Sequence, residues 1–264
     1  MNRIDVVDAE FLQGLARQAG EAILEVYGTD FDVERKADAS PLTEADLAAH
    51  RVIADGLSER YPEIPILSEE STERDSYEVR RHWTRFWMVD PLDGTKEFIK
   101  RNGQFTVNIA LMENCRARAG VVYAPVLDLL YYGELGQGAF KKEGAGAAQR
   151  LTAASPNASP NNGDRLVIAG SLSHPTPEMD AFIAESRTKY KEVEFVAMGS
   201  SLKICMVADG RADVYPRFGP TMEWDTAAAH AIASAAGRKV LRHGSDQELS
   251  YNKPDLHNDW FLVC

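Results

Sequence analysis

The sequence predicts a mixed α and β fold, and three observations support this prediction. The chain has 264 residues, which is long enough for one large domain or two lobes around a sizeable core. Helical and strand periodicities alternate along it, and no internal repeat is present. One stretch of small and polar residues separates two such regions. We therefore expect helices packed on sheets rather than an all-helical or all-strand chain.

The first half predicts two helices and then a group of strands. Apolar residues recur at helical spacing over 11–27, and this helix is expected to end near Gly28. A second helix is expected to run to Leu57, with Thr43 as its cap. Apolar and β-branched runs follow. Strands are expected at 64–67, 86–89, 107–112, 120–125 and 129–134, the last three as a meander.

The second half alternates strands and helices after a polar boundary. Residues 144–163 are rich in Ala, Ser, Asn, Pro and Gly, although 150–152 is a strand candidate. We expect an N-terminal α+β lobe over 1–145 and a C-terminal α/β lobe over 146–264. Beyond the boundary, we expect strands at 166–169, 193–196 and 213–215, and helices at 177–189, 201–208 and 225–236, with Gly237 ending the last.

Charge and hydropathy exclude several classes of protein. The formal net charge of −11 argues against binding to nucleic acid or to an anionic membrane. No transmembrane segment is expected. Asp5, Asp8 and Glu10 interrupt the N-terminus, so a signal peptide is not expected either. Three widely spaced cysteines follow no metal-ligand spacing and indicate reduced thiols in a cytoplasmic protein. They are Cys115, Cys205 and Cys264.

The most informative motif is the run Asp-Pro-Leu-Asp-Gly-Thr at residues 90–95, directly after an apolar strand pattern. Pro91 fixes φ, so we expect a sharp turn that aims Asp90 and Asp93 at one point. The same turn makes the carbonyl of Leu92 available. Mg²⁺ binds oxygen ligands and keeps water or substrate phosphate in its shell, so a few carboxylates are enough for a site.

The last two residues of the motif suit a phosphate site. Gly94 has no Cβ and lets backbone amides approach a ligand, and Thr95 adds a hydroxyl. The alternative is an acidic turn that caps the following helix, since Asp-Gly is common in turns.

Two further acidic segments strengthen the metal interpretation. Glu69 and Glu70 follow another short apolar run, and Asp225 follows Trp224 at a helix start. Taken singly, Glu69 and Glu70 are explained equally well as a solvated charge pair, and Asp225 as a helix cap. Together with residues 90–95, they supply the oxygen ligands that a two-cation site requires.

This ordered set of motifs resembles the inositol monophosphatase superfamily of Mg²⁺-dependent, lithium-sensitive phosphatases, over nearly the whole chain. Longer strings resemble the bacterial 3'(2'),5'-bisphosphate nucleotidases of the CysQ type within it; these strings lie at 40–43, 95–103, 199–203 and 215–220. The resemblance implies an α+β fold, a layered αβαβα sandwich with the metal site between two lobes.

The resemblance also implies an activity. The implied substrate is adenosine 3',5'-bisphosphate, and water is expected to attack its 3'-phosphate directly to give AMP and phosphate, with no phospho-enzyme. This reaction recycles a by-product of sulfate assimilation. Two or three Mg²⁺ ions are implied, and Li⁺ inhibits. Association with the inner membrane and a homodimer both stay open.

Carried over by motif, the resemblance assigns roles to individual residues. Those implied to bind metal are Glu69, Asp90, Leu92 through its carbonyl, Asp93 and Asp225. Those implied to act on the attacking water are Asp46 and Thr95, with Glu70 near the water network. Those implied to bind substrate are Gly94, Thr95, His174, Ser200, Lys203, Arg217 and Asp225.

The residues themselves support the substrate assignments unevenly. Lys203 and Arg217 are cations in an acidic chain, and a substrate with two phosphates needs a cationic partner for the phosphate that is not on the metal. The alternative for both is ordinary surface charge. His174 is more simply explained as a loop residue with one local hydrogen bond.

Other functions remain as alternatives. Haloacid-dehalogenase phosphatases also carry an Asp-Gly-Thr ending after a strand, but their two aspartates are two positions apart, whereas Asp90 and Asp93 are three apart. An inositol monophosphatase or a sugar bisphosphatase would keep the metal site and use a different substrate. A catalytically silent cation or nucleotide sensor is the alternative that is not an enzyme.

Overall fold

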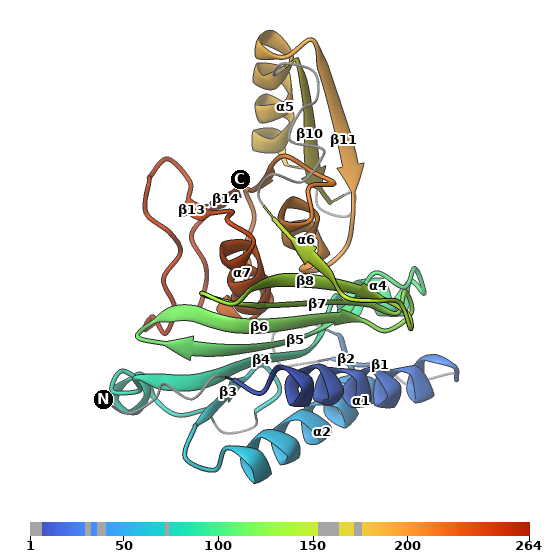
Figure 1. The fold of residues 1–264 in the computed structure, drawn as a ribbon, viewed down its shortest axis with the longest axis vertical. Helices are drawn as coiled ribbons and strands as arrows, with labels where there is room; N and C mark the ends of the chain where they lie inside the picture. The colour runs from blue at the N-terminus through green and yellow to red at the C-terminus, as the bar shows by residue number, and fades with distance from the viewer. Residues whose placement is uncertain (1–6, 30–32, 36–40, 72–73, 153–163, 172–175) are drawn as a thin grey trace.

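The computed structural model describes residues 7–29, 33–35, 41–71, 74–152, 164–171 and 176–264. Its elements stack in five layers, which Figure 1 shows from the first helices at the bottom to a single helix at the top. The first layer contains α1 (Ala9–Tyr27) and α2 (Glu44–Arg60), which cover one face of a large sheet. Two short strands, β1 (Val33–Arg35) and β2 (Pro41–Thr43), pair with each other next to these helices.

The second layer is a seven-stranded sheet in the order β3-β4-β5-β6-β7-β8-β9. β3 and β4 are parallel, and every later neighbour is antiparallel, which confirms the expected meander. Its strands are β3 (Ile66–Ser68), β4 (Arg85–Asp93), β5 (Thr106–Glu113), β6 (Arg116–Ala124), β7 (Leu129–Glu134), β8 (Gly138–Glu143) and β9 (Gln149–Leu151). Because β9 pairs with β8, this sheet extends to Leu151.

The remaining layers come from the second half of the chain. The third layer contains α6 (Leu202–Ala208) and α7 (Glu223–Ala235). The fourth contains the parallel pair β10 (Arg165–Gly170) and β11 (Glu192–Ala197), and the antiparallel set β12 (Tyr215–Arg217), β14 (Phe261–Val263) and β13 (Val240–Arg242). The fifth is α5 (Pro177–Lys189). The order α, β, α, β, α confirms the expected sandwich.

Local sequence explains how the first two helices begin and end. Asp8 caps α1 by accepting a bond of 3.0 Å from the Phe11 amide, and Gly28 ends the helix as expected. The second helix continues three residues beyond the predicted end, to Arg60. The expectation that Thr43 caps it concerns a side chain outside the described residues.

Side chains of the central strands are buried on both faces of the large sheet. On β4, Trp87 and Val89 pack with the α1 and α2 side, whereas Phe86 and Met88 pack with the α7 side. Both faces are covered by helices, so the strand is a continuous apolar run rather than an alternating one. This explains why its sequence pattern was readable as a buried strand.

Two strand boundaries also differ from those expected. The chain does not turn sharply after Val89, because β4 continues to Asp93 with a register irregularity between Asp90 and Asp93. Pro91 lies in this irregularity, where its missing N–H removes no regular ladder bond. The strand expected at 213–215 is shifted, since β12 begins at Tyr215 and Val214 forms an isolated bridge.

Helix α7 sits very close to the large sheet because glycines face it. A Cβ added at Gly120 would lie 2.3 Å from the carbonyl oxygen of Ala228, and one at Gly133 would lie 2.6 Å from the Cα of Ile232. The helix itself is rich in alanine over this contact. Small residues on both elements therefore fix the position of α7 on the sheet.

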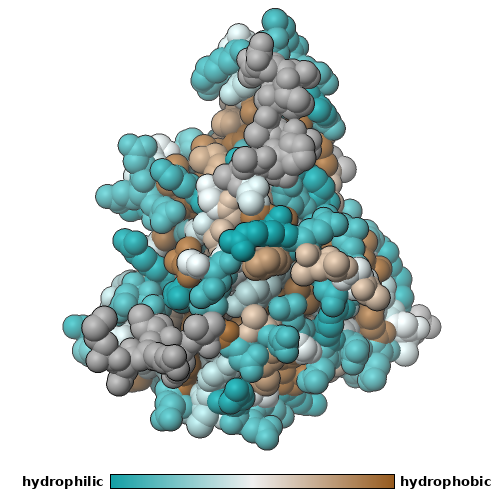
Figure 2. Space-filling view, in the orientation of Figure 1, coloured by the Kyte–Doolittle hydropathy of each residue, from teal (hydrophilic) through white to brown (hydrophobic). Residues whose placement is uncertain are grey.

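The outer surface agrees with the layered arrangement. The face shown in Figure 2 is mostly hydrophilic, with hydrophobic side chains in small groups between polar ones. Large apolar side chains that are exposed among the described residues are few: Val79, Val126, Leu127 and Trp260. No helix within the described ranges is long and apolar enough to cross a membrane.

We expect Gly120→Ala to lower the free energy of unfolding by about 1–3 kcal/mol, because the added methyl collides with the α7 backbone. The matched control is Gly14→Ala in α1, where no atom lies within 4 Å of an added Cβ. That change should raise stability by about 1 kcal/mol through helix propensity. Urea unfolding measures both. Equal changes in the free energy of unfolding in the two variants would contradict the close packing of α7 against the sheet.

Candidate active site

Three acidic residues from separate segments meet at one place. Glu69 follows β3, Asp90 lies on β4 and Asp225 lies in the first turn of α7. One carboxylate oxygen of each lies within 4.8 Å of the others. The structure therefore brings together one acidic residue from each of the three motifs.

Strand pairing places two of these carboxylates side by side. β3 and β4 run parallel with Ser68 opposite Val89, so Glu69 and Asp90 come next in register. The Glu69 amide donates a bond of 3.1 Å to the Val89 carbonyl. Parallel neighbours thus deliver both acidic residues to the same end of the sheet.

Asp225 reaches the cluster from the opposite side, and its position corrects one expectation. The helix begins at Glu223, two residues before the predicted start, and Met222 is its N-cap. Asp225 is the third helical residue, and its Oδ2 accepts a bond of 2.9 Å from the Met222 amide. The helix N-terminus stabilises negative charge there.

The electrostatics of the cluster favour a cation. Burial raises the pKa of Asp90 well above its ordinary value, and the charges of Glu69, Asp93, Asp225 and Asp46 raise it further. Burial also raises the pKa of Asp225, followed by the charges of Asp93 and Glu69. Buried like charges are unfavourable unless something compensates them. An all-oxygen donor set of this kind fits a hard divalent cation.

Asp93 connects the acidic cluster to the loop before α6. Its Oδ2 accepts a bond of 2.7 Å from the Ser201 amide and another from the Ser200 hydroxyl. Ser200 has a left-handed backbone, with φ of 55°, which turns the chain toward Asp93. The hydroxyl of Thr106 lies 2.5 Å from the Ser200 hydroxyl and supports it. A metal-ligand candidate and a substrate-binding candidate are therefore in contact.

The rest of the 90–95 motif forms part of the same wall. The Leu92 amide donates a bond of 3.1 Å to Asp90 Oδ1. Gly94 has φ of 93° and is the N-cap of the short helix α4 (Thr95–Ile99), which has no side-chain cap bond. Neither aspartate caps that helix, so the alternative of an acidic capping turn is wrong. Leu92, Gly94 and Thr95 all line the cavity described next.

A cavity of about 740 Å³ extends from the acidic cluster to a cationic wall. Ser200, Lys203 and Arg217 line it, as the resemblance implied. Lys203 is buried and its Nζ donates a bond of 2.6 Å to the Ser200 carbonyl. Burial lowers the pKa of Lys203 to about 8, against the opposing charge of Asp93. Negative and positive groups thus share one cavity.

Three further predicted residues are placed less directly. Asp46 is buried in the first turn of α2, and its charge acts on Asp90. Glu70 lies in the turn after β3, and its amide is 3.4 Å from the Ser68 hydroxyl. Burial lowers the pKa of His50, and the charge of Glu70 opposes that shift. His174 lies outside the described residues.

The sequence did not reveal several residues of the cavity wall. Arg74 is the clearest: its Nε donates a bond of 3.3 Å to the Ser68 carbonyl, and another of its nitrogens donates to the Glu69 carbonyl. Its guanidinium lies 4.8 Å from the centre of the Trp224 ring. Lys96 and His257 also line the cavity. Lys96 belongs to the string at 95–103 named above, whereas Arg74 and His257 follow no sequence spacing, so no motif could identify those two.

Comparison with known proteins agrees with this geometry. The inositol monophosphatase family model matches residues 7–259. The 3'(2'),5'-bisphosphate nucleotidase CysQ of Escherichia coli O6:H1 is 50% identical over 228 residues, which cover 86% of this chain and 87% of that protein. The protein of the same name from Shigella flexneri is 52% identical over 229 residues, with 86% and 87% covered.

Solved structures agree as well. The crystal structure of CysQ from Bacteroides thetaiotaomicron, a bacterial member of the inositol monophosphatase family, superposes with a TM-score of 0.84 at 45% identity, covering 97% of this chain and 96% of that one. An IMPase from Thermotoga maritima gives a TM-score of 0.74 at 25% identity, covering 96% and 90%. This chain belongs to the inositol monophosphatase family.

Proposed function

We propose that this chain is a 3'(2'),5'-bisphosphate nucleotidase that hydrolyses the 3'-phosphate of adenosine 3',5'-bisphosphate to give AMP and phosphate. One observation carries the proposal: a single cavity has a carboxylate cluster in one part and the cations Lys203 and Arg217 in another. A substrate with two phosphates needs both kinds of partner. Relatives of about 50% identity over most of the chain carry this name.

The family is metal-dependent, and the acidic cluster fits Mg²⁺ as the cation. Its proposed ligands are Glu69, Asp90, Asp93 and Asp225, with the carbonyl of Leu92. Bound at such a site, two or three Mg²⁺ ions would supply Lewis acidity and lower the pKa of a water molecule. Li⁺ is expected to inhibit.

The chain's own residues then act on the attacking water. We propose that Thr95, at the cavity wall, holds this water through its hydroxyl and that the buried carboxylate of Asp46 takes up the proton. Glu70 lies next to Glu69 and supports the surrounding water. Attack is direct, and no residue forms a covalent phosphate.

The second phosphate needs a separate partner. We propose that Lys203 and Arg217 bind the 5'-phosphate, since charge-assisted hydrogen bonds recognise phosphate strongly. Ser200 and Gly94 complete the wall around the nucleotide, with His174 as a further expected contact. Because the pKa of Lys203 is about 8, this amine is mostly protonated at neutral pH.

The proposed setting follows from the substrate. We propose that the enzyme acts in the cytoplasm, where it recycles a nucleotide by-product of sulfate assimilation. Cell fractionation tests for loose attachment to the inner membrane, and sedimentation tests for a homodimer. All three cysteines are free thiols in the structure, which is consistent with a reducing compartment.

The function is tested by comparing phosphate release from adenosine 3',5'-bisphosphate, inositol 1-phosphate and fructose 1,6-bisphosphate with Mg²⁺, and again with Li⁺ added. We expect the highest kcat/KM for the nucleotide, and inhibition by Li⁺. Preference for inositol phosphate or the sugar would keep the cation site and reject the nucleotide wall. Release from none of them would favour a sensor.

Asp90→Asn should abolish turnover and cation binding while leaving the metal-free fold at least as stable, because it removes one of several repelling buried charges. Mg²⁺ at 100 times its Kd should raise the wild-type free energy of unfolding by about 2.7 kcal/mol. The variant should show no rise. Asp164→Asn, which breaks an exposed pair with Lys191, is the control and should respond like the wild type. A variant that retains the Mg²⁺ response would contradict the ligand assignment.

The pH dependence of substrate binding should report Lys203. Its folded pKa of about 8 means that the amine loses its charge as pH rises through that value, so KM for the bisphosphate should increase above pH 8. In Lys203→Ala this inflection should disappear, and KM at neutral pH should rise about 10-fold or more, since a charged hydrogen bond contributes about 1.5–3 kcal/mol. A simple monophosphate ester serves as the control substrate. Equal losses on both substrates would make Lys203 structural.

A further inference from the structure

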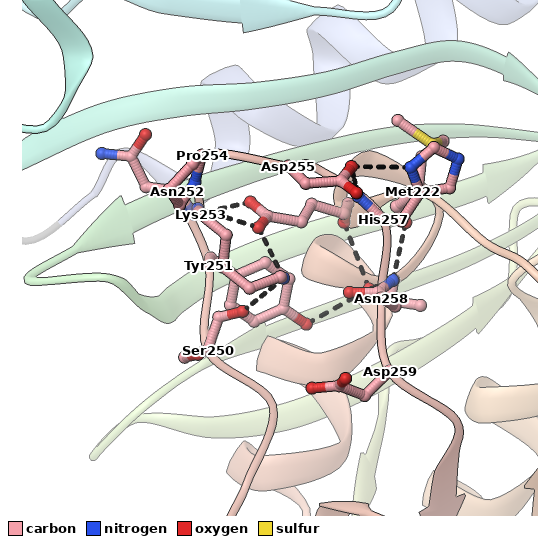
Figure 3. Close-up of polar contacts among 12 residues, drawn as sticks. Met222, Ser250, Tyr251, Asn252, Lys253, Pro254, Asp255, His257, Asn258 and Asp259 are labelled. Atoms are coloured by element: carbon pink, nitrogen blue, oxygen red, sulfur yellow. Dashed lines mark hydrogen bonds and ion pairs between the residues drawn. The ribbon is translucent and has the colours of Figure 1, made fainter. Parts of the chain in front are cut away.

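A segment near the end of the chain is packed against the start of α7. We call residues 250–258 the C-terminal loop; it lies between β13 and β14. Figure 3 shows it passing Met222, with Lys253, His257 and Asn258 joined by dashed contacts to neighbouring groups. Neither the motifs nor the proposed reaction assigns this loop a role.

Asn258 binds the turn that leads into α7. Its Nδ2 donates to the Met222 carbonyl at 2.8 Å and to the Thr226 hydroxyl at 3.0 Å, and its amide donates to the Thr221 carbonyl at 2.8 Å. One side chain thus contacts residues on both sides of Asp225. The first turn of the helix is held from outside as well as by its own hydrogen bonds.

Glu223 joins the same turn to the middle of the loop. Its carboxylate is fully buried and accepts bonds from the Asn252 amide at 2.5 Å and the Lys253 amide at 3.1 Å, and from Lys253 Nζ at 2.6 Å. The Glu223 amide in turn donates to the Leu256 carbonyl at 2.9 Å. A buried charge with this many partners fixes its surroundings, because each partner must stay in place.

The other side of the loop is tied to the segment that follows Glu69. Arg80, at the end of the short helix α3 (Tyr77–Arg80), is buried and donates to Asn252 Oδ1 at 2.8 Å and to the Pro254 carbonyl at 3.0 Å. Asn252 Nδ2 donates back to the Arg80 carbonyl at 2.7 Å. Asn252 therefore contacts Arg80 on one side and Glu223 on the other.

A second and shorter connection runs between the same two segments. Arg74 donates to the carbonyls of Ser68 and Glu69 and places its guanidinium over the ring of Trp224. Arg74 joins Glu69 itself to the helix start that carries Asp225, whereas the contacts of the C-terminal loop reach Arg80 in α3, which follows Glu69 in the chain. These two carboxylates come from elements that do not pair with each other in a sheet.

We propose that the C-terminal loop positions the start of α7, and with it Asp225, and thereby sets the affinity of the cation site, with Glu223 and Asn252 as positioning residues. The inference rests on the cation site of the proposed function. Groups that orient metal ligands without touching the metal typically change metal affinity 10–100-fold when they are mutated. The C-terminal loop orients Asp225 in this way without contributing a metal ligand of its own.

The test measures binding of Mn²⁺, used as a paramagnetic probe, by the electron paramagnetic resonance signal of the free ion. Glu223→Gln should raise the Kd for Mn²⁺ about 10-fold. Asn252→Ala should have the same effect, and it provides the test if Glu223→Gln folds poorly. The matched control is Glu134→Gln, which alters another buried carboxylate, one bonded to Tyr132 and Arg118 on the far part of the sheet. Its Kd should equal that of the wild type.

A positioning role also predicts rescue. Excess Mn²⁺ should restore kcat in Glu223→Gln, and the circular dichroism of the metal-free variant should equal that of the wild type, because a bound cation can also stabilise a damaged fold. Equal Kd values in Glu223→Gln, Asn252→Ala and the wild type would overturn this inference alone. Absence of Mn²⁺ binding to the wild type, or unchanged binding in Asp225→Asn, would overturn the proposed cation site and this inference with it.

Discussion

Repulsion among three closely spaced carboxylates, one buried and two half-buried, constrains the elements that carry them. Glu69, Asp90 and Asp225 bring oxygens within 4.8 Å of one another, and burial raises the pKa of both aspartates. Such a cluster opposes folding until a cation compensates it, so the surrounding scaffold must be rigid enough to hold it. The parallel pairing of β3 with β4 provides part of that rigidity, and the close packing of α7 against Gly120 and Gly133 provides the rest.

The same scaffold links the acidic cluster to the substrate wall. Asp93 accepts hydrogen bonds from the Ser200 hydroxyl and the Ser201 amide, and Lys203 donates to the Ser200 carbonyl. A change in the conformation of the loop before α6 would therefore alter the hydrogen bonds of a candidate cation ligand and of the amine proposed to bind the second phosphate. One hydrogen-bond network thus connects a proposed cation ligand to a residue proposed to bind the substrate.

Much of the fold could be predicted from sequence, because local patterns determine it. The helix ending at Gly28 and the meander follow from periodicity, and the family resemblance supplied the layer order. The errors have physical causes: Pro91 is accommodated in an irregular strand, and α7 begins two residues early because Asp225 bonds the Met222 amide. The long-range contacts were unreadable, since Arg80 and Asn252 are 172 residues apart.

We propose above that this carboxylate cluster binds a divalent cation. The most direct measurement is anomalous diffraction from crystals soaked in Mn²⁺, recorded at the manganese absorption edge. We expect anomalous peaks within direct bonding distance of oxygens of Glu69, Asp90 and Asp225, between about 2.0 Å, the distance typical of Mg²⁺, and about 2.6 Å, the upper distance for Ca²⁺. Peaks elsewhere, with none at this cluster, would show that the cluster is not a cation site.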